Sequence, residues 1–221
     1  MEKMPYQPEL DRTTATSATG VVTSDWRAGL PVLAGSNFTL RELRSDDAES
    51  LLAMLTTEEV ARFISPPPTT VEGFERFIAW TQRERLAGSY VCFGIVPKGM
   101  QHAVGLFQLR SLEPGFASCE WGFASGSSFW GTGVFPEGAR LVVNFAVDVI
   151  GAQRLEARAA VANGRGNGAL RKIGAVQEGI LRNHKTVGSG HIRNTVFFSI
   201  VDREWPDVKA RLDARIAAAS P

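Results

Sequence analysis

The sequence predicts one α/β domain of the α+β kind, built on a single mixed, mostly antiparallel sheet flanked by helices. Hairpin-like strand pairs occur in both halves of the chain, and a loop containing two close glycines, followed by an amphipathic helix, separates two strands. At 221 residues with 44% hydrophobic content, the chain can bury one sizeable core. We therefore expect a tail or lead-in segment over residues 1–37 and one domain over residues 38–216.

Before the glycine-containing loop, the sequence predicts four strands and three helices. Residues 38–43 alternate apolar and polar side chains, as a half-buried strand does. Capping-box patterns beginning at Asp46 and Thr69 indicate helix starts, and three prolines at 66–68 must end the helix between them. The expected elements are a strand over 38–43, helices over 46–55, 58–64 and 69–86, and strands over 90–96, 102–109 and 116–124.

The part after the loop begins with the best-marked helix of the chain. Apolar residues recur along it with a period of 3.6, Pro136 suits its first turn, and Gly151 stands where a terminating glycine would. Residues 163–168 contain three glycines and predict a second, flexible loop. The remaining expected elements are a strand over 154–161, a short helix over 169–173, strands over 176–181 and 195–201, and a terminal helix from Asp202.

The loop over residues 125–134 carries the first functional signal. Gly131 and Gly133 let backbone N–H groups approach a ligand, and the following helix N-terminus favours negative charge. The loop therefore predicts phosphate or pyrophosphate binding, with simple turn chemistry as the alternative. A dinucleotide-binding fold is disfavoured, because Pro136 stands where the third glycine of that fingerprint would lie.

Composition and charge exclude several other classes of function. The net charge of +1 argues against nucleic-acid binding, although residues 151–193 carry eight Lys/Arg against two Glu, which suits a small polyanion or an ordinary solvated face. No apolar run could span a membrane, and the N-terminus lacks a secretory signal. Cys92 and Cys119 predict buried free thiols in a cytoplasmic protein, and three scattered histidines predict no metal site.

Six short stretches, taken in order, resemble the Gcn5-related N-acetyltransferase (GNAT) superfamily, and within it the branch of ribosomal-protein N-terminal alanine acetyltransferases. The resemblance covers about residues 38–205. The matching stretches are Phe38–Leu43 with Asp46–Ala48, Glu120–Phe123, Phe129–Gly133, Leu155–Arg158, Asn163–Gly174 and Glu178–Arg182.

This resemblance implies a sheet that splays between strands 116–124 and 154–161 to form a cleft for acyl-CoA. Asn163 and Asn167 would face the pantetheine side, and Arg171 or Lys172 would reach a CoA phosphate; a turn-forming Asn163 and a solvated Lys172 are the alternatives. The implied backbone contacts are Phe129, Trp130, Gly131, Thr132, Gly133 and Val134 for the pyrophosphate, and Gly122, Phe123 and Ala124 for the pantetheine arm.

The chemistry that the resemblance implies is direct acetyl transfer from acetyl-CoA to a primary amine. Glu120 is the first candidate for the general base, unless it only pairs with a basic neighbour or points to solvent. His184, expected in the loop after residues 181–182, is the second, unless it is a surface histidine. Trp121 and Trp130 could line the acceptor pocket, although tryptophans in such positions are usually part of the core.

The acceptor stays open: a protein N-terminus, an antibiotic or a small metabolite. The alternative function is an acyl-CoA-binding sensor or regulator of the same fold without efficient transfer. A homodimer is plausible from the resemblance. The chain departs from the ribosomal-protein branch at the acceptor side, with Gly166 in place of a serine, Lys185 in place of a glutamate, and Arg193-Asn194 where an aspartate often stands.

Overall fold

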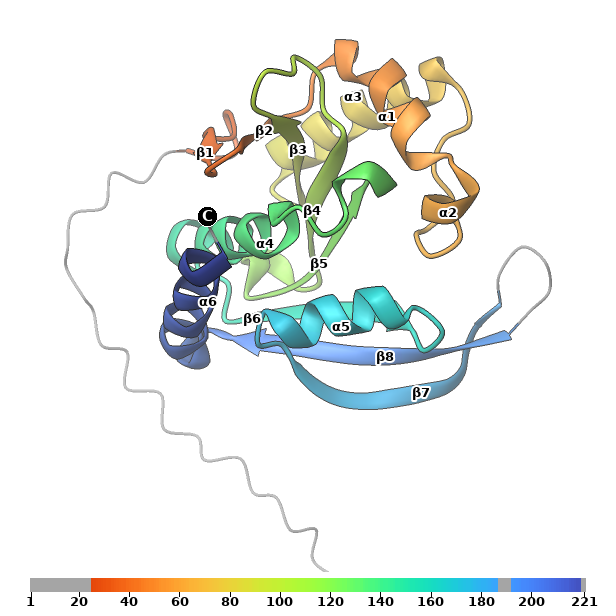
Figure 1. Cartoon of the computed structure of the whole chain (residues 1–221). Coiled ribbons are helices and arrows are strands. Elements are labelled where there is room, and N and C mark those ends of the chain that lie inside the picture. The colour runs from red at the N-terminus through yellow and green to blue at the C-terminus, as the bar shows by residue number, and fades with distance from the viewer. Residues whose placement is uncertain (1–24, 187–191, 220–221) are drawn as a thin grey trace, which may run out of the picture.

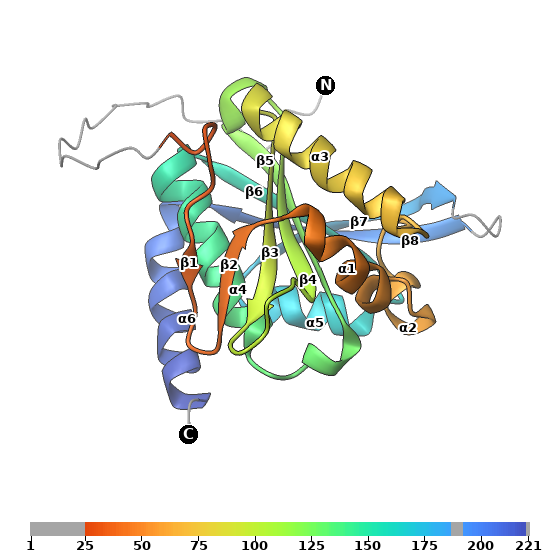
Figure 2. The same cartoon turned by 90° about the horizontal axis from the view of Figure 1, so that it is seen from above.

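The structure, a computed structural model, describes residues 25–186 and 192–219, and these residues build an eight-stranded sheet with helices on both faces (Figure 1, Figure 2). The strand order is β1-β2-β3-β4-β5-β6-β8-β7. Every neighbouring pair is antiparallel except β5 and β6, which are parallel. The predicted mixed, mostly antiparallel sheet is confirmed.

The helices and strands from β2 onward follow one another in the predicted order, but several of them begin or end at other residues than predicted. The strands are β1 (Leu33–Ala34), β2 (Phe38–Glu42), β3 (Tyr90–Pro97), β4 (Gly105–Ser111), β5 (Ser118–Ser125), β6 (Arg154–Ala160), β7 (Val176–Thr186) and β8 (Ile192–Val201). The α-helices are α1 (Ala48–Leu55), α2 (Glu58–Ala61), α3 (Val71–Ala87), α4 (Val134–Asn144), α5 (Gly164–Lys172) and α6 (Trp205–Ala219). The short 3-10 helices are η1 (Ser45–Asp47), η2 (Pro114–Phe116), η3 (Ser127–Phe129) and η5 (Asp202–Glu204). The π-helix η4 (Phe145–Ile150) continues α4.

Two of the expected helix caps are shifted by one residue. The hydroxyl of Thr70, not Thr69, accepts a hydrogen bond from the N–H of Gly73 at the start of α3. The N-cap of α1 is Asp47, not Asp46, and its side chain makes no capping hydrogen bond to that helix. It instead accepts from the N–H of Arg44 and turns inward to a buried ion pair with Arg41. The helix α2 is also shorter than the expected 58–64.

The helix after the glycine-containing loop matches its prediction. Gly138 packs so closely on the Phe107 ring that an added Cβ would lie 2.5 Å from it, which fixes the helix against the sheet. Gly151, at φ 86°, ends the helical run in the left-handed conformation that favours glycine.

The second half of the chain departs most from expectation. The helix α5 begins at Gly164, not at Ala169, because the Asn163 side chain accepts from the N–H of Gly166 and starts the helix inside the glycine-rich segment. The strand β7 continues to Thr186 across an irregularity at residues 181–185. His184 therefore lies in a strand, and its expected place in a loop is wrong.

Two hydrophobic clusters cover the two faces of the sheet. One packs β3–β6 and β8 against α4, α5 and α6; the other packs β3 and β4 against α1 and α3, and Figure 1 shows these two groups of helices on opposite sides of β3 and β4. In the lead-in segment, Trp26 packs edge-on against Phe116, with ring centroids 5.6 Å apart. Val32, in the same segment, is 66% exposed. Of the expected tail or lead-in segment over residues 1–37, residues 1–24 lie outside the described residues.

The sheet opens between β5 and β6. These strands pair only through Ser118–Glu120 and Arg154–Glu156. Beyond that point β5 continues to Ser125 along β4, and β6 continues to Ala160 along β8. The predicted splay is thus confirmed, and it positions the site described below. None of the helices that the structure describes is long and apolar enough to cross a membrane.

Candidate functional site

A cavity of about 1460 Å³ opens where β5 and β6 diverge. Its walls come from β5 and the loop after it, from β6 and α5, from β7 and β8, and from the segment between α2 and α3. The predicted site residues that line it are Glu120, Gly122, Phe123, Ala124, Phe129, Trp130, Gly131, Thr132, Gly133, Val134, Asn163, Lys172 and His184.

The glycine-containing loop has the geometry of an anion cradle. Gly131 and Gly133 have φ of 79° and 86°, and a Cβ added at either would meet nothing within 4 Å. Gly133 is the N-cap of α4, and no side chain caps that helix. The hydroxyl of Thr132 donates to the carbonyl of Phe129, 2.8 Å away, and holds the turn. The helix α4 therefore begins without a side-chain cap at its positive end, next to open space around the two glycines, which favours a phosphate.

The residues Gly122–Ala124 lie on the part of β5 that has left β6. Their other neighbour, β4, pairs with them throughout. One edge of the strand therefore carries backbone N–H and C=O groups that β6 does not satisfy. Such an edge suits an extended ligand that hydrogen-bonds to backbone.

The polar residues predicted on α5 separate into two groups. Asn163 and Lys172 line the cavity, although Asn163 also serves as the helix cap. Asn167 does not line it: it is 4% exposed, and its amide donates to the carbonyls of Ala160 and Asn163. Arg171 does not line it either, because its guanidinium lies over the Phe198 ring. Of the two cations expected near CoA phosphate, only Lys172 is at the cavity.

Glu120 lines the cavity, and its carboxylate has basic neighbours. Its carboxylate pairs with Arg110 on β4 and with Arg158 on β6, the latter at 3.4 Å. Arg110 and Glu120 are register partners, and so are Glu120 and Glu156. Arg158 follows Glu156 by two residues on β6, so the side chains of Arg110, Glu120 and Arg158 lie on the same face of the sheet. Glu120 therefore pairs with basic neighbours, which was the stated alternative, and it also lines the cavity.

His184 reaches the same cavity from β7. Its ring packs edge-on against Phe197, with centroids 5.6 Å apart, and the side chain is exposed. His184 is thus a surface histidine, as the stated alternative has it, that also lines the cavity.

Sequence reasoning missed a contact across the cavity. The guanidinium of Arg165, in the first turn of α5, lies over the Trp130 ring at 3.9 Å from its centroid. Trp130 belongs to the loop after β5, so this cation–π contact joins the two walls. The basic character of residues 151–193 was a signal for Arg165, but only the fold shows which of these cations face the cavity.

Three buried polar atoms at the cavity have no hydrogen-bond partner among the described residues. They are the indole nitrogen of Trp121, Nε of Arg193 and the hydroxyl of Thr195. Trp121 and Thr195 are each only 2% exposed. Because an unpaired buried polar atom is costly, these atoms fit a cavity whose polar partners come from a bound ligand or water.

One group of potential metal ligands lies away from the cavity. Ligand atoms of Asp46, Asp47 and His102 are within 4.8 Å of one another. The carboxylate of Asp47 is already engaged by the Arg41 guanidinium and by the N–H groups of Arg44 and Ala103. With its one buried carboxylate occupied by a cation, this group carries no metal assignment.

Comparison with known proteins gives the family context. Residues 37–176 match the family model described as "Acetyltransferase (GNAT) domain". The N-acetyltransferase p20 of Bacillus licheniformis, described as uncharacterized, is 23% identical over 177 residues, which cover 80% of this chain and 99% of that protein.

Solved structures share the fold. A GCN5-related N-acetyltransferase from Brucella melitensis has a TM-score of 0.72 at 24% identity, covering 84% of this chain and 85% of that one. Mycobacterium smegmatis RimJ in complex with CoA-disulfide also has a TM-score of 0.72, at 20% identity, covering 80% and 88%. At these identities the likeness shows the fold.

Proposed function

The chain belongs to the GNAT family of acetyltransferases, and on that premise we propose that it moves an acetyl group from acetyl-CoA to a primary amine by direct attack of the amine on the thioester. The observation that carries the proposal is the continuity of the cavity. It runs from the glycine-containing loop along the free edge of β5 to the carboxylate of Glu120. Anion cradle, backbone edge and carboxylate thus follow one another as the parts of the reaction require.

The donor substrate would use the first two of these parts. Its diphosphate would accept hydrogen bonds from the N–H groups of residues 131–134, because those of Phe129 and Trp130 already donate to the carbonyls of Gly126 and Ser127. Its pantetheine arm would pair with the backbone of Gly122–Ala124. Lys172 would supply charge on the opposite wall. The Arg165 side chain, stacked on Trp130, stands between the walls and must leave room for the bound arm.

The transfer itself needs a neutral amine and a place for its proton. The amine nitrogen would attack the thioester carbon while a backbone N–H on the β5 edge stabilises the oxyanion. The C–S bond then breaks, the thiolate leaves, and Glu120 takes the amine proton directly or through a water. Arg110 and Arg158 would fix the orientation of that carboxylate.

The acceptor would enter from the face that carries Glu120. His184, Arg193 and Thr195 line the cavity there, and the Nε of Arg193 and the hydroxyl of Thr195 have no hydrogen-bond partner among the described residues. Gly166 stands where ribosomal-protein relatives are thought to use a serine. In this conformation an added Cβ at Gly166 would lie 2.5 Å from the Asn163 amide nitrogen, so a serine there would disturb the cap of α5. A peptide N-terminus and a small-molecule amine both remain candidates.

The test combines binding and turnover. Calorimetry with acetyl-CoA and with CoA should show micromolar binding of both, and CoA release should then rise above a no-enzyme control for at least one amine in a panel of peptides and small amines. Binding without any turnover would contradict transfer and favour the acyl-CoA-binding alternative. Absence of binding would contradict the assignment of the loop and the cleft.

A further inference from the structure

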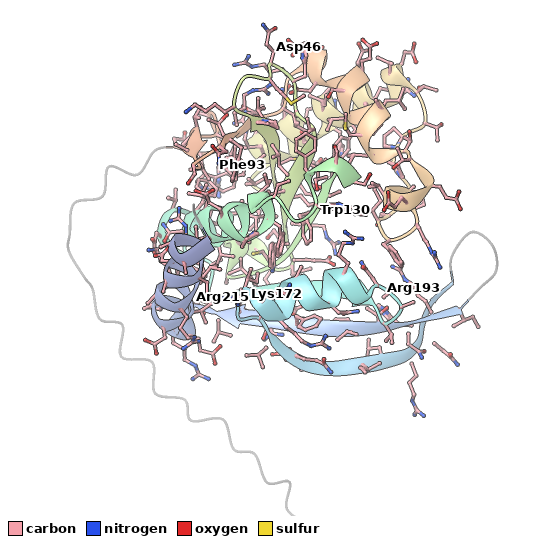
Figure 3. The ribbon with its side chains drawn as sticks, in the orientation of Figure 1. Asp46, Phe93, Trp130, Lys172, Arg193 and Arg215 are labelled. Carbon is pink, nitrogen blue, oxygen red and sulfur yellow. The ribbon has the colours of Figure 1, made fainter. Side chains whose placement is uncertain are left out.

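Two cations from different helices meet at one end of the cavity. Lys172 is the last residue of α5, and Arg215 lies on α6; both line the cavity. Nη1 of Arg215 donates a hydrogen bond to the backbone carbonyl of Lys172, which fixes the guanidinium beside that residue. Figure 3 shows the two side chains next to each other, at the end of α5 far from Arg193.

Neither cation has an ion-pair partner among the described residues. Asp213, two residues before Arg215 on α6, pairs instead with Lys209 at 2.8 Å and with Arg140 at 3.3 Å. Glu137, which lines a hollow together with Arg215, accepts hydrogen bonds from the N–H and hydroxyl of Ser36. The C-terminal end of α5 tolerates positive charge because the helix dipole is negative there. Two cations held together without a carboxylate form a site that an anionic group of a ligand would complete.

The place of Arg215 relative to the glycine-containing loop narrows the identity of that group. Arg215 also lines a smaller hollow of about 250 Å³, together with Thr132, Gly133 and Val134 of the loop. The cation pair is therefore adjacent to the loop proposed to hold the diphosphate. In CoA, the ribose that carries the diphosphate on its 5′ carbon carries a separate phosphate on its 3′ carbon, so the two groups are a few bonds apart.

We propose that Lys172 and Arg215 bind the 3′-phosphate of CoA, so that the protein discriminates CoA from 3′-dephospho-CoA. The proposal rests on the proposed function, since it takes the diphosphate to lie on residues 131–134. Arg215 lies on the terminal helix, beyond residues 37–176 that match the family model.

Calorimetry with CoA and with 3′-dephospho-CoA tests the proposal, using the whole chain and the variants Arg215→Met and Lys172→Met. The unsubstituted protein should bind CoA about 10- to 100-fold more tightly than 3′-dephospho-CoA, the range expected for charge-assisted hydrogen bonds. Each variant should bind CoA more weakly than the unsubstituted protein does, while its affinity for 3′-dephospho-CoA stays unchanged. Binding of 3′-dephospho-CoA also shows that the variant is folded. The matched control is Arg211→Met, an exposed arginine one turn earlier on α6 that does not line the cavity.

The other outcomes separate the proposal from the function beneath it. Equal binding of the two ligands by the unsubstituted protein would overturn the proposal and leave the function standing. If each variant lost the same affinity for both ligands, the cation pair would bind the diphosphate and not the 3′-phosphate. That result would also overturn the proposal. If neither ligand bound, the proposed function itself would fall.

Discussion

The carboxylate of Glu120 on β5 lies 3.4 Å from Nε of Arg158 on β6, just beyond the last residue pair that joins these strands. Where the backbone pairing stops, a side-chain ion pair thus bridges the opening. Arg158 is held in turn by the Phe197 ring, 4.9 Å from its guanidinium carbon. The carboxylate that we propose as the proton acceptor is therefore fixed from both sides of the cleft.

Replacing Glu120 with Gln should lower kcat by on the order of 100-fold, because the amide cannot take the amine proton, while KM for acetyl-CoA stays unchanged. Steady-state kinetics with one accepted amine would measure both constants. Glu156→Gln is the matched control: Glu156 is the register partner of Glu120 and pairs with Arg154 and Arg158, but it does not line the cavity. Equal kcat values for both variants would remove Glu120 from the mechanism.

Replacing Gly133 with Ala should weaken CoA binding roughly tenfold, because the added Cβ would project into open space at the N-cap of α4, where we propose that the diphosphate lies. The φ of 86° also makes the alanine strained, so stability should fall by roughly 1 kcal/mol. Calorimetry and thermal unfolding would measure the two effects.

Gly99→Ala separates strain from contact. Gly99 has φ 84° and equally open space around it, but it lies in the turn after β3, away from the cavity. It should lose similar stability and keep its affinity for CoA. A loss of affinity in both variants would mean that strain, not the cradle, explains the effect at Gly133.

Features set by neighbouring residues in the chain could be predicted from the sequence. The ends of the helices at Gly88 and Gly151 follow from glycine in the left-handed conformation, and the turn at Gly131–Gly133 follows from the same property. The place of the splay could not be predicted from local patterns, because no local pattern fixes which strands separate. The resemblance to a known family supplied that expectation.

Features set by contacts between distant residues could not be predicted in this way. The glycines of residues 164–168 have low helix propensity, yet the Asn163 cap and the Asn167 amide bonds make them the first turns of α5. The pairing of Glu120 with Arg110 and Arg158 depends on strand register. The position of Arg215 at the cavity depends on how α6 packs, which its own sequence does not state.

The two cysteines should be unreactive in the native protein. Burial raises the pKa of the Cys119 thiol to about 12 and also raises that of Cys92 above its ordinary value, so little thiolate forms near neutral pH. A thiol reagent such as 5,5′-dithiobis(2-nitrobenzoate) at pH 8 should therefore give no rapid reaction. In denaturant, both thiols should titrate, since neither is in a disulfide. Rapid native reaction of either thiol would contradict the packing around β3 or β5.

The last prediction concerns Asp47, which ties β2 to the turn before β4. Its side chain is fully buried, lies 2.7 Å from Nη1 of Arg41, and accepts hydrogen bonds from the N–H groups of Arg44 and Ala103. Burial disfavours the charged carboxylate, but the hydrogen bonds from Arg41 and from the two N–H groups outweigh it and lower the pKa of Asp47.

Asp47→Asn should lower the free energy of unfolding at pH 7 by about 3–5 kcal/mol, because the Arg41 guanidinium is left buried without its counter-charge. Since folding lowers the pKa of Asp47, its stabilising contribution is present above the ordinary carboxyl pKa and is lost as the pH falls through the lowered value. The unsubstituted protein should therefore lose more stability than Asp47→Asn between pH 5 and the onset of acid unfolding, as measured by urea titrations at successive pH values. Asp46→Asn, a change at the exposed neighbour, is the control and should follow the unsubstituted protein. If Asp47→Asn and Asp46→Asn showed the same stability at pH 7, the buried pair would contribute nothing to the fold.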